Sequence, residues 1–303
     1  MQGEPSGVIV IDKPADMTSA RVVEFIKRSL KAKKVGHAGT LDPYATGVLV
    51  CCINQATRLA RFLLGGDKVY RAVCHLGVET DTQDATGTVI AVAENPRFSV
   101  EVLRSVVKQF KGVSLQQPPV FSALKHKGIP LYKLAREGKP IQKEPREIFI
   151  SSIDLLKVEL PSICLEVCCS AGTYVRALCA DIGKALGCGG HLKELRRLES
   201  SGFRIDEAVS LKELENCVKE GRLENLIIGM ADALRKMPSY IADRGLVGKI
   251  INGKRLNSED FHSGRMPESK GYLKVVDEKN RLYAVLDVNP KSGQYRYCRV
   301  FPQ

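Results

Sequence analysis

Apolar runs and helical periodicity alternate along the first two thirds of the chain. The runs GVIVIDKP and GVLVCCI are typical of short buried strands, and KVYRAVCHLG alternates so that Tyr70, Ala72, Cys74 and Leu76 share one face. EIFISSIDLLKVEL and SICLEVCCSAGTY predict a strand pair. Apolar residues at helical spacing predict helices in TSARVVEFIKRSLKAKK (N-cap Thr18 or Ser19), ATRLARFLL, SVEVLRSVVKQF (N-cap Ser99), TYVRALCADIGKALG and SLKELENCVKEG.

The pattern changes near Met237 and Pro238. Residues 238–303 contain GKIINGKRL, GYLKVVDEKNRLYAVLDV and YRYCRVF, which predict short strands separated by turns. Such a segment is typical of a small β-barrel or sandwich. The sequence therefore predicts one domain over 1–237 and a smaller one over 238–303.

Charge points to the kind of partner. In 303 residues, 46 Lys and Arg outnumber 34 Asp and Glu, which gives a formal net charge of +12. This excess suits a polyanion, either nucleic acid or an anionic membrane, although it also serves simple solubility. The membrane is the weaker alternative because no run approaches the roughly 20 apolar residues of a spanning helix and no Trp is present. The N-terminus does not resemble a secretory signal, so we expect a cytoplasmic protein.

The ten cysteines do not form a recognisable metal or disulfide pattern. Cys51 and Cys52 are adjacent within an apolar run, as are Cys168 and Cys169, and no C-x-x-C occurs. We interpret them as small, buried, reduced side chains. CGGH, residues 188–191, has ligand-like spacing, but no second pair stands nearby to complete a tetrahedral site, and we predict no metal.

A basic and aromatic segment follows the third predicted helix. SLQQPPVFSALKHKGIPLYKLAREGKPIQKEPRE mixes prolines with Lys, Arg and His side chains and with Phe121 and Tyr132. Cations that hold phosphates and rings that stack on bases suit a nucleic-acid surface. A flexible solvated insertion has much the same composition, so composition alone leaves both alternatives open.

Two charged residues stand in unusual local settings. Asp42 lies in the glycine-rich segment GHAGTLDPYATG, where an Asp-Pro pair is most often a turn former. Arg176 lies in the first turn of a predicted helix, where a cation opposes the helix dipole unless an anion is near. The acidic segment GVETDTQDATG, with Asp81 and Asp84, we interpret as a turn rather than a metal site.

Several segments together resemble one known family. GHAGTLDPYATGVL resembles the catalytic motif of the TruB family of tRNA pseudouridine synthases. Further similar segments follow in the family's order between about residues 7 and 205: IDKPADMTS, DKVYRA, LGVETDTQDATG, QQPPVFSALKHKGIPLYKLAREG and GTYVRALCADIGKALGCGGHLKELRR. Such ordered agreement is more specific than any single motif. The C-terminal segment resembles, more loosely, the PUA RNA-binding module.

The resemblance implies a fold and an activity. The fold is α+β, with a central mixed, largely antiparallel sheet flanked by helices and a small C-terminal β-barrel of the PUA type. The activity is that of a tRNA pseudouridine-55 synthase, which flips a uridine out of the T-arm loop and rejoins its C5 to the ribose. Asp42 is then the catalytic aspartate, and the sequence does not decide whether it attacks the sugar or the base. Arg176 would pair with Asp42, and an opposite charge at this range lowers a carboxyl pKa by about 1 to 3 units.

The remaining roles also follow from the resemblance. Tyr70 would stack on the uracil and assist proton transfer from C5, and His37 would help to displace the target base from the RNA loop. The other residues implied at the substrate site are Tyr174, Lys13, Pro14 and Leu195. The basic segment, about 112–146, is similar to the family's thumb and would close on the T arm of tRNA. The isomerisation needs neither cofactor nor metal, and we expect a monomer with no membrane partner.

Two alternatives remain. A dyskerin-type enzyme shares the aspartate motif but takes its target from a guide RNA within a protein complex. A non-catalytic tRNA-folding chaperone would bind tRNA without converting it. The compact C-terminus and the segment SALKHKGIPLYKLAREG favour the stand-alone enzyme.

Overall fold

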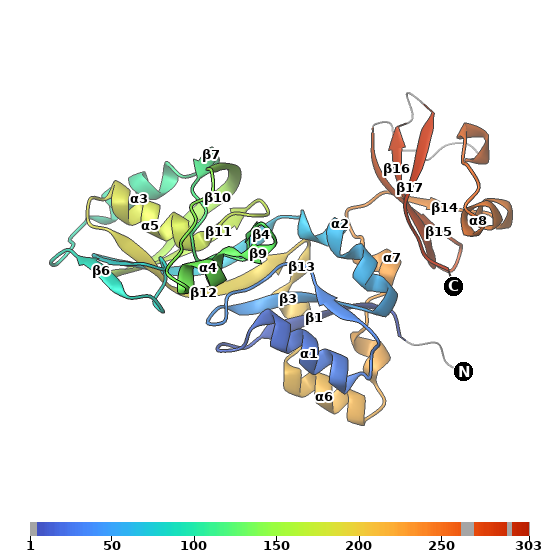
Figure 1. Cartoon of the computed structure of the whole chain (residues 1–303), viewed down its shortest axis with the longest axis horizontal. Coiled ribbons are helices and arrows are strands. Elements are labelled where there is room, and N and C mark those ends of the chain that lie inside the picture. Colours follow the sequence, from blue (N-terminus) through green and yellow to red (C-terminus); the bar gives the residue numbers. More distant parts are fainter. Residues whose placement is uncertain (1–4, 262–269, 290–292, 303) are drawn as a thin grey trace.

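A single large sheet runs through most of the protein (Figure 1). The computed structural model describes residues 5–261, 270–289 and 293–302. The sheet has nine strands in the order β1-β3-β12-β4-β11-β10-β7, with β13 paired to β12 and β2 paired to β3. Its strands are β1 Gly7–Lys13, β2 Val35–His37, β3 Thr46–Ile53, β4 Lys68–Leu76, β7 Gly112–Gln116, β10 Arg146–Glu159, β11 Ser162–Cys169, β12 Gly190–Ser200 and β13 Phe203–Arg204.

The sheet is mixed and largely antiparallel, as predicted. The one parallel contact joins β12 to β3, at the pairs Arg196 with Thr46 and Arg197 with Gly47. On its other side β12 pairs antiparallel with β4, with Arg197 opposite Tyr70. A register shift follows Arg197 in this ladder, and such bulges re-aim side chains near sites. β12 therefore joins the two halves of the sheet.

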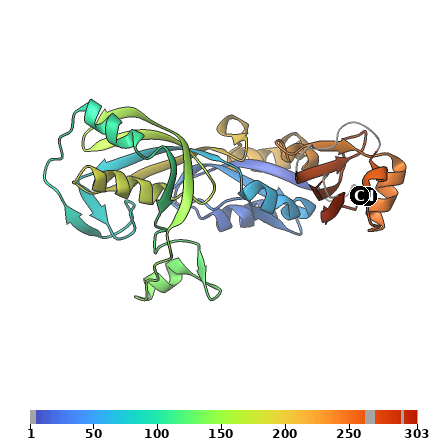
Figure 2. The same cartoon turned by 90° about the horizontal axis from the view of Figure 1, so that it is seen from above.

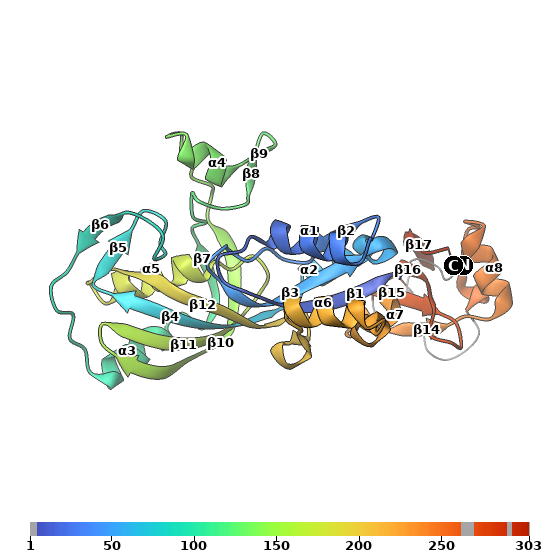
Figure 3. The same ribbon diagram turned by 90° about the horizontal axis from the view of Figure 1, so that it is seen from below.

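Helices cover the sheet through apolar stripes. The first group lies against β1 and β3 or continues from them: α1 Ser19–Ser29, α2 Ala60–Leu64, α6 Leu211–Lys219 and α7 Met230–Ala233. α1 and α6 lie beside β1 (Figure 1 and Figure 3). Val22 and Ile26 of α1 and Leu214 of α6 pack in one cluster on β1 and β3. The other half of the sheet packs on α3 Val100–Lys108 and α5 Val175–Ala185. The predicted caps Thr18 and Ser99 accept hydrogen bonds from the backbone of α1 and α3.

The predicted helix ATRLARFLL is confirmed only in part. It begins as a 3-10 turn over Asn54–Leu59 and becomes α-helical only in α2. Further 3-10 turns cover Ile205–Glu207, Leu223–Leu226 and Ser258–Asp260. A separate hairpin of β5 Val78–Thr80 and β6 Val89–Val92 carries the acidic turn between its strands.

The basic segment leaves the sheet as a protrusion. We call residues 117–145, between β7 and β10, the excursion. It contains β8 Lys125–His126, β9 Ile129–Pro130 and α4 Leu131–Arg136, and it projects from the body of the molecule (Figure 2). The first part of the expected thumb, residues 112–116, instead forms the edge strand β7.

The C-terminal segment forms an open sheet, and the expectation of a closed barrel was wrong for the described residues. Its elements are β14 Ser239–Ile241, α8 Arg244–Ile251, β15 Gly271–Val276, β16 Leu282–Asn289 and β17 Gln294–Val300, with strand order β14-β15-β16-β17. Ala284 and Leu286 pack in the cluster that contains Ile250 of α8. Val285 packs in a different cluster, with Leu59 of the larger unit. Because the sheet buries both faces against other elements, it does not need to close on itself.

Within the described ranges, no helix is long and apolar enough to cross a membrane. All ten cysteines are free thiols, and the predicted burial is confirmed for five of them, whereas the other five are half-buried. No group of three or more His, Cys, Asp or Glu side chains in the described ranges could hold a metal ion.

Candidate active site

Asp42 lies in a tightly held turn between β2 and β3. The backbone N–H of Leu41 donates to the Ser19 hydroxyl at 2.9 Å, and this hydroxyl donates back to the Leu41 carbonyl at 3.1 Å. Gly39 has a φ of +120°, which glycine adopts without strain. The turn is therefore fixed from the buried N-terminus of α1 while Asp42 stays partly accessible.

Arg176 holds two carboxylates at once. Its Nε lies 3.1 Å from Asp42 Oδ2, and its Nη1 lies 3.4 Å from Asp84 Oδ2. The side chains of Arg176 and Asp84 are 6% and 5% exposed, whereas that of Asp42 is 35% exposed. The anions explain why a cation is tolerated in the first turn of α5. The predicted contact between Asp42 and Arg176 is present.

Backbone carbonyls complete the coordination of Arg176. Its guanidinium donates to the Thr82 carbonyl at 3.2 Å and to the Phe121 carbonyl at 2.8 Å. Phe121 belongs to the excursion and Thr82 to the acidic turn. One guanidinium thus links α5, the Asp42 turn, the acidic turn and the excursion.

Burial and charge shift the pKa of Asp42 in the direction opposite to that expected. Burial raises this pKa and the neighbouring Asp84 charge adds to the increase, while Arg176 and Lys13 only partly counter it. The expected lowering considered the charge of Arg176 alone and left out the desolvation of a buried carboxyl and the repulsion from Asp84, which together outweigh the attraction to the two cations.

A cavity of about 310 Å³ opens beside this network. Asp42, Arg176, Tyr70, Tyr174 and Leu195 all line it. They come from the turn before β3, from α5, from β4, from the residue before α5 and from β12. The structure therefore brings together five of the eight residues that the sequence indicated.

The two tyrosines are held differently. Tyr70 is almost fully buried within β4. Tyr174 is fixed through its backbone, because its N–H donates to Gln116 Oε1 at 2.7 Å and its carbonyl accepts from Gln116 Nε2 at 3.0 Å. The Arg146 guanidinium lies 5.1 Å from the Tyr174 ring centroid. Ala123 and Leu124 of the excursion close the cavity from above the sheet.

The other three residues do not line the cavity. The buried Lys13 ammonium donates to the carbonyls of Pro14, Met17 and Pro43 at 2.6 to 2.9 Å, so it supports the turn that carries Asp42. Burial lowers the pKa of Lys13 to about 8. Pro14 is exposed and contributes its carbonyl. His37 lies on β2 with a buried Nδ1 that has no hydrogen-bond partner in the described residues, and burial lowers its pKa.

Two residues of the site were missed by the sequence reasoning. Asp84 was interpreted as part of an ordinary turn, yet it accepts hydrogen bonds from the Thr82 and Thr86 hydroxyls at 2.8 and 2.6 Å. Arg197 is 1% exposed and also lines the cavity. The available signal was the adjacent pair Arg196 and Arg197. Neighbouring residues on a strand point to opposite faces, so one of the two arginines must face inward if this segment is a strand.

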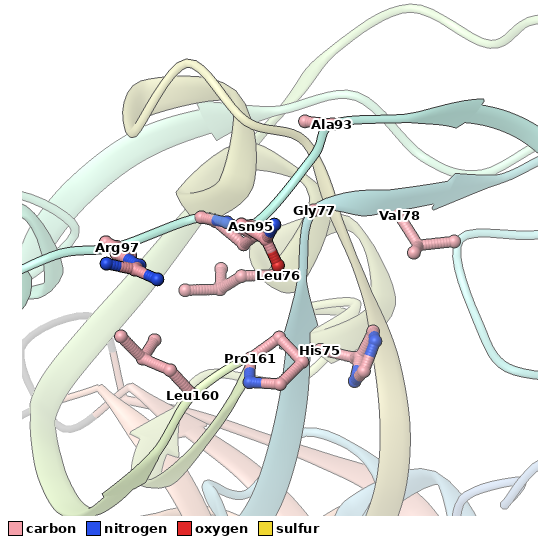
Figure 4. A pocket seen from close by; sticks show the side chains of 10 residues that line it. His75, Leu76, Gly77, Val78, Ala93, Asn95, Arg97, Leu160 and Pro161 are labelled. Atoms are coloured by element: carbon pink, nitrogen blue, oxygen red, sulfur yellow. The ribbon is translucent and has the colours of Figure 1, made fainter.

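A second cavity lies at the far end of β4 (Figure 4). It measures about 480 Å³ and is bordered by His75, Asn95, Arg97 and Leu160 among others. None of its lining residues is a carboxylate or a tyrosine. We therefore assign the candidate chemistry to the smaller cavity beside Asp42.

Comparison with known families gives two consecutive matches. Residues 27–175 match the model described as TruB family pseudouridylate synthase (N terminal domain), and residues 176–237 match that of the tRNA pseudouridylate synthase B C-terminal domain. The chain is 42% identical over 300 residues to tRNA pseudouridine synthase B of Syntrophobacter fumaroxidans, covering 98% of both chains. It is 49% identical over 234 residues to the enzyme of the same name from Syntrophotalea carbinolica, covering 77% of this chain and 76% of the relative.

Solved structures show the same fold. An H/ACA RNP bound to a substrate RNA containing 2'-deoxyuridine includes a chain that matches with a TM-score of 0.76 at 25% identity, over 98% of this chain and 85% of that one. A Cbf5-Nop10-Gar1 complex matches with a TM-score of 0.76 at 27% identity, over 97% of this chain and 82% of the other.

Proposed function

Because this chain belongs to the TruB family and is an isomerase that forms pseudouridine in tRNA, we propose that it acts on uridine 55 in the T-arm loop, with Asp42 as the catalytic carboxylate. The observation that carries the proposal is the Asp42 carboxylate held by Arg176 at the wall of a cavity. A catalytic carboxylate must be ionised and accessible. Asp42 is the more exposed of the two acids that Arg176 holds, so we assign the reaction to Asp42. Asp84 then serves to balance the charge of Arg176.

The size and lining of the cavity support entry of a single flipped base. The uracil must turn over relative to its ribose, and a stacked loop offers no room for this rotation. Extrusion costs a few kcal/mol of unstacking, of which stacking on Tyr70 returns about 1 to 3 kcal/mol. Tyr174 and Leu195 provide further apolar contact. His37 would fill the space left in the RNA loop, a role that does not require it to line the cavity.

The chemistry balances without an oxidant or reductant. The N1–C1′ bond breaks and the C5–C1′ bond forms, after which C5 loses a proton and its electron pair restores the C5–C6 double bond. N1 gains a proton from water. We assign proton removal from C5 to Tyr70, because it is the cavity tyrosine on the central strand.

The excursion supplies a surface for the phosphates of the T arm. Its exposed cations surround α4 and the β8–β9 hairpin: Lys125, Lys127, Lys133, Arg136 and Lys139. Ala123 and Leu124 of the same segment line the cavity. RNA bound along these cations would present its loop to Asp42, with shape and phosphate spacing rather than groove sequence as the recognised features.

We further propose that residues 1–237 form the catalytic unit and that 238–303 form an RNA-binding domain of the PUA type. The C-terminal sheet is anchored to the catalytic unit, since the Lys274 ammonium donates to the carbonyls of Ala231 and Leu234 at 2.8 and 3.1 Å. A fixed second domain extends the surface available to tRNA. The protein would act as a cytoplasmic monomer.

The sequence comparisons favour the stand-alone enzyme over the guide-dependent one. The relatives named tRNA pseudouridine synthase B are 42% and 49% identical to this chain, whereas the chains from the RNP complexes are 25% and 27% identical. The folding-chaperone alternative predicts RNA binding without product.

Tritium release from tRNA transcript that carries 5-tritiated uridine tests the proposal. Forming the C5 glycosidic bond expels that hydrogen, so we expect release by the wild type and none by Asp42→Asn, with tRNA binding retained by the variant. Asp81→Asn is the matched control, because Asp81 lies in the acidic turn but only accepts from the Thr88 N–H; its release should equal that of the wild type. Turnover by Asp42→Asn would refute the mechanism. A requirement for added guide RNA would favour the dyskerin type, and binding without release would favour the chaperone.

A further inference from the structure

Arg197 is a fully buried cation that the proposed reaction does not yet use. Its Nε donates to the Val48 carbonyl at 2.7 Å, and its terminal nitrogens donate to the carbonyls of Gly39 and Thr40 at 3.1 and 3.5 Å. No ion pair of Arg197 with a carboxylate occurs within 4.0 Å in the part of the chain that the structure describes. Burying a cation without a carboxylate is costly, so a position of this kind is a candidate for function.

Arg197 also faces Tyr70. The two residues lie opposite each other in the antiparallel ladder of β12 and β4, where directly opposed residues share one face of the sheet, and both line the cavity beside Asp42. Because a guanidinium has only donors, the Tyr70 oxygen is the acceptor in any hydrogen bond between these two side chains.

The backbone of β3 lies in close contact with the backbone of Arg197. Gly47 pairs with Arg197 across the parallel contact of β3 and β12. A Cβ at Gly47 would lie 2.2 Å from the Arg197 carbonyl oxygen. The bulge that follows Arg197 directs its side chain beneath the Asp42 turn. Arg197 thus contacts the segment that leads to Asp42 and lies beside Tyr70 on the neighbouring strand.

We propose that Arg197 is a positioning residue that acts through Tyr70: it fixes the phenol oxygen relative to the Asp42 turn and stabilises the phenolate that accepts the C5 proton. The inference rests on the proposed function. In the step concerned, the Tyr70 phenolate takes the proton from C5 and becomes a phenol, and the C5–H electron pair closes the C5–C6 double bond. The phenol then returns its proton to water. A fixed cation beside this oxygen favours its anionic form before the transfer, when the negative charge on Tyr70 is largest.

The electrostatics of Tyr70 agree with this geometry. Burial raises the pKa of Tyr70, and Cys169 and Asp42 raise it further. The influences that lower this pKa both come from the Arg197 guanidinium.

The test combines single-turnover rates with an isotope effect at C5. We expect Arg197→Met to lower the rate of tritium release about tenfold or more, the factor typical of one hydrogen bond to a charged group, while its Kd for tRNA changes less than about twofold. Arg197→Lys, which keeps the cation with fewer donors, should restore part of the rate. With uridine deuterated at C5, the ratio of protium to deuterium rates should rise in Arg197→Met above the wild-type value, because proton removal becomes limiting. A substitution that only disturbs the structure lowers the fraction of enzyme molecules that are active and leaves this ratio unchanged.

Arg196→Met is the matched control. Arg196 precedes Arg197 on β12 but pairs with Asp12 at 2.7 Å, away from Tyr70, so its isotope ratio should equal that of the wild type. If Arg197→Met does not fold, Arg197→Gln carries the test, because its amide still donates hydrogen bonds but has no charge, and it should raise the same ratio. An unchanged ratio in folded Arg197→Met or Arg197→Gln would overturn the inference while the wild type still turns over. Absence of tritium release by the wild type would instead overturn the proposed function.

Discussion

Asp42→Asn should make the protein more stable at neutral pH while it abolishes turnover. Arg176 lies between two carboxylates, so the buried cluster carries one excess negative charge. The substitution removes that excess and leaves Arg176 paired with Asp84. Because the pKa of Asp42 is raised in the folded protein, ionising this carboxyl costs stability that an uncharged amide does not lose.

The expected magnitude is modest. One pKa unit corresponds to about 1.4 kcal/mol, and solvent screens a side chain that is 35% exposed. We therefore expect Asp42→Asn to raise the free energy of unfolding by about 1 kcal/mol, or the Tm by about 2 to 4 °C.

The sign of the pH dependence follows from linkage. A carboxyl whose pKa is raised on folding stabilises the folded state fully below its unfolded pKa of about 4, and this contribution is lost as pH rises through the folded value. The advantage of Asp42→Asn should accordingly be small in acid and reach its full size above the raised pKa. Thermal unfolding of both proteins at a series of pH values between about 4.5 and 8 measures it.

Asp84→Asn provides the contrast. Asp84 is the more buried partner of Arg176 and accepts hydrogen bonds from Thr82 and Thr86. Its substitution should lower the free energy of unfolding by about 1 to 3 kcal/mol, because Arg176 keeps Asp42 as its partner but the buried hydrogen bonds to the Asp84 carboxylate are disturbed. An Asp42→Asn variant that is less stable than the wild type at pH 8, or whose advantage does not change with pH, would refute the charge count on which the argument depends.

Three further predictions follow from single contacts. The Tyr44 hydroxyl is buried without a hydrogen-bond partner in the described residues, so Tyr44→Phe should raise the free energy of unfolding in urea by about 1 kcal/mol; a loss of stability would show that the hydroxyl is satisfied. Lys13→Met orphans three carbonyls and should lower stability by about 2 to 3 kcal/mol and slow tritium release more than it weakens tRNA binding; an unchanged rate would separate Lys13 from the Asp42 turn. Lys125→Glu with Lys133→Glu should weaken tRNA binding and reduce the salt dependence by about 0.7 log unit per tenfold salt for each lost phosphate contact, whereas Lys219→Glu on α6 should not; equal effects would contradict the role of the excursion.

The sequence allowed good prediction of features that depend on local periodicity. Strand alternation placed Tyr70 on the buried face of β4, and the caps Thr18 and Ser99 marked where two helices begin. The contact between Asp42 and Arg176 was also accessible, because a cation in the first turn of a helix requires an anion and the resemblance supplied one.

Features that depend on tertiary neighbours were not accessible. Asp84 appears in the sequence as a turn residue, since nothing local shows that α5 places a guanidinium beside it. Burial, the largest cause of the raised pKa of Asp42, is likewise a tertiary property that the local sequence does not show. Strand alternation also could not show that β16 has a partner on each face, Ile250 on one and Leu59 on the other, which is why a closed barrel was expected.

The hydrogen bond from Arg176 to the Phe121 carbonyl connects the excursion to the side chain that also pairs with Asp42. An outward movement of the excursion displaces the Phe121 carbonyl and therefore disturbs the Arg176 guanidinium, which also pairs with Asp42 and Asp84. RNA binding by the excursion and the charge balance around Asp42 are therefore coupled, and we expect substitutions far out on the excursion to alter the setting of this carboxylate.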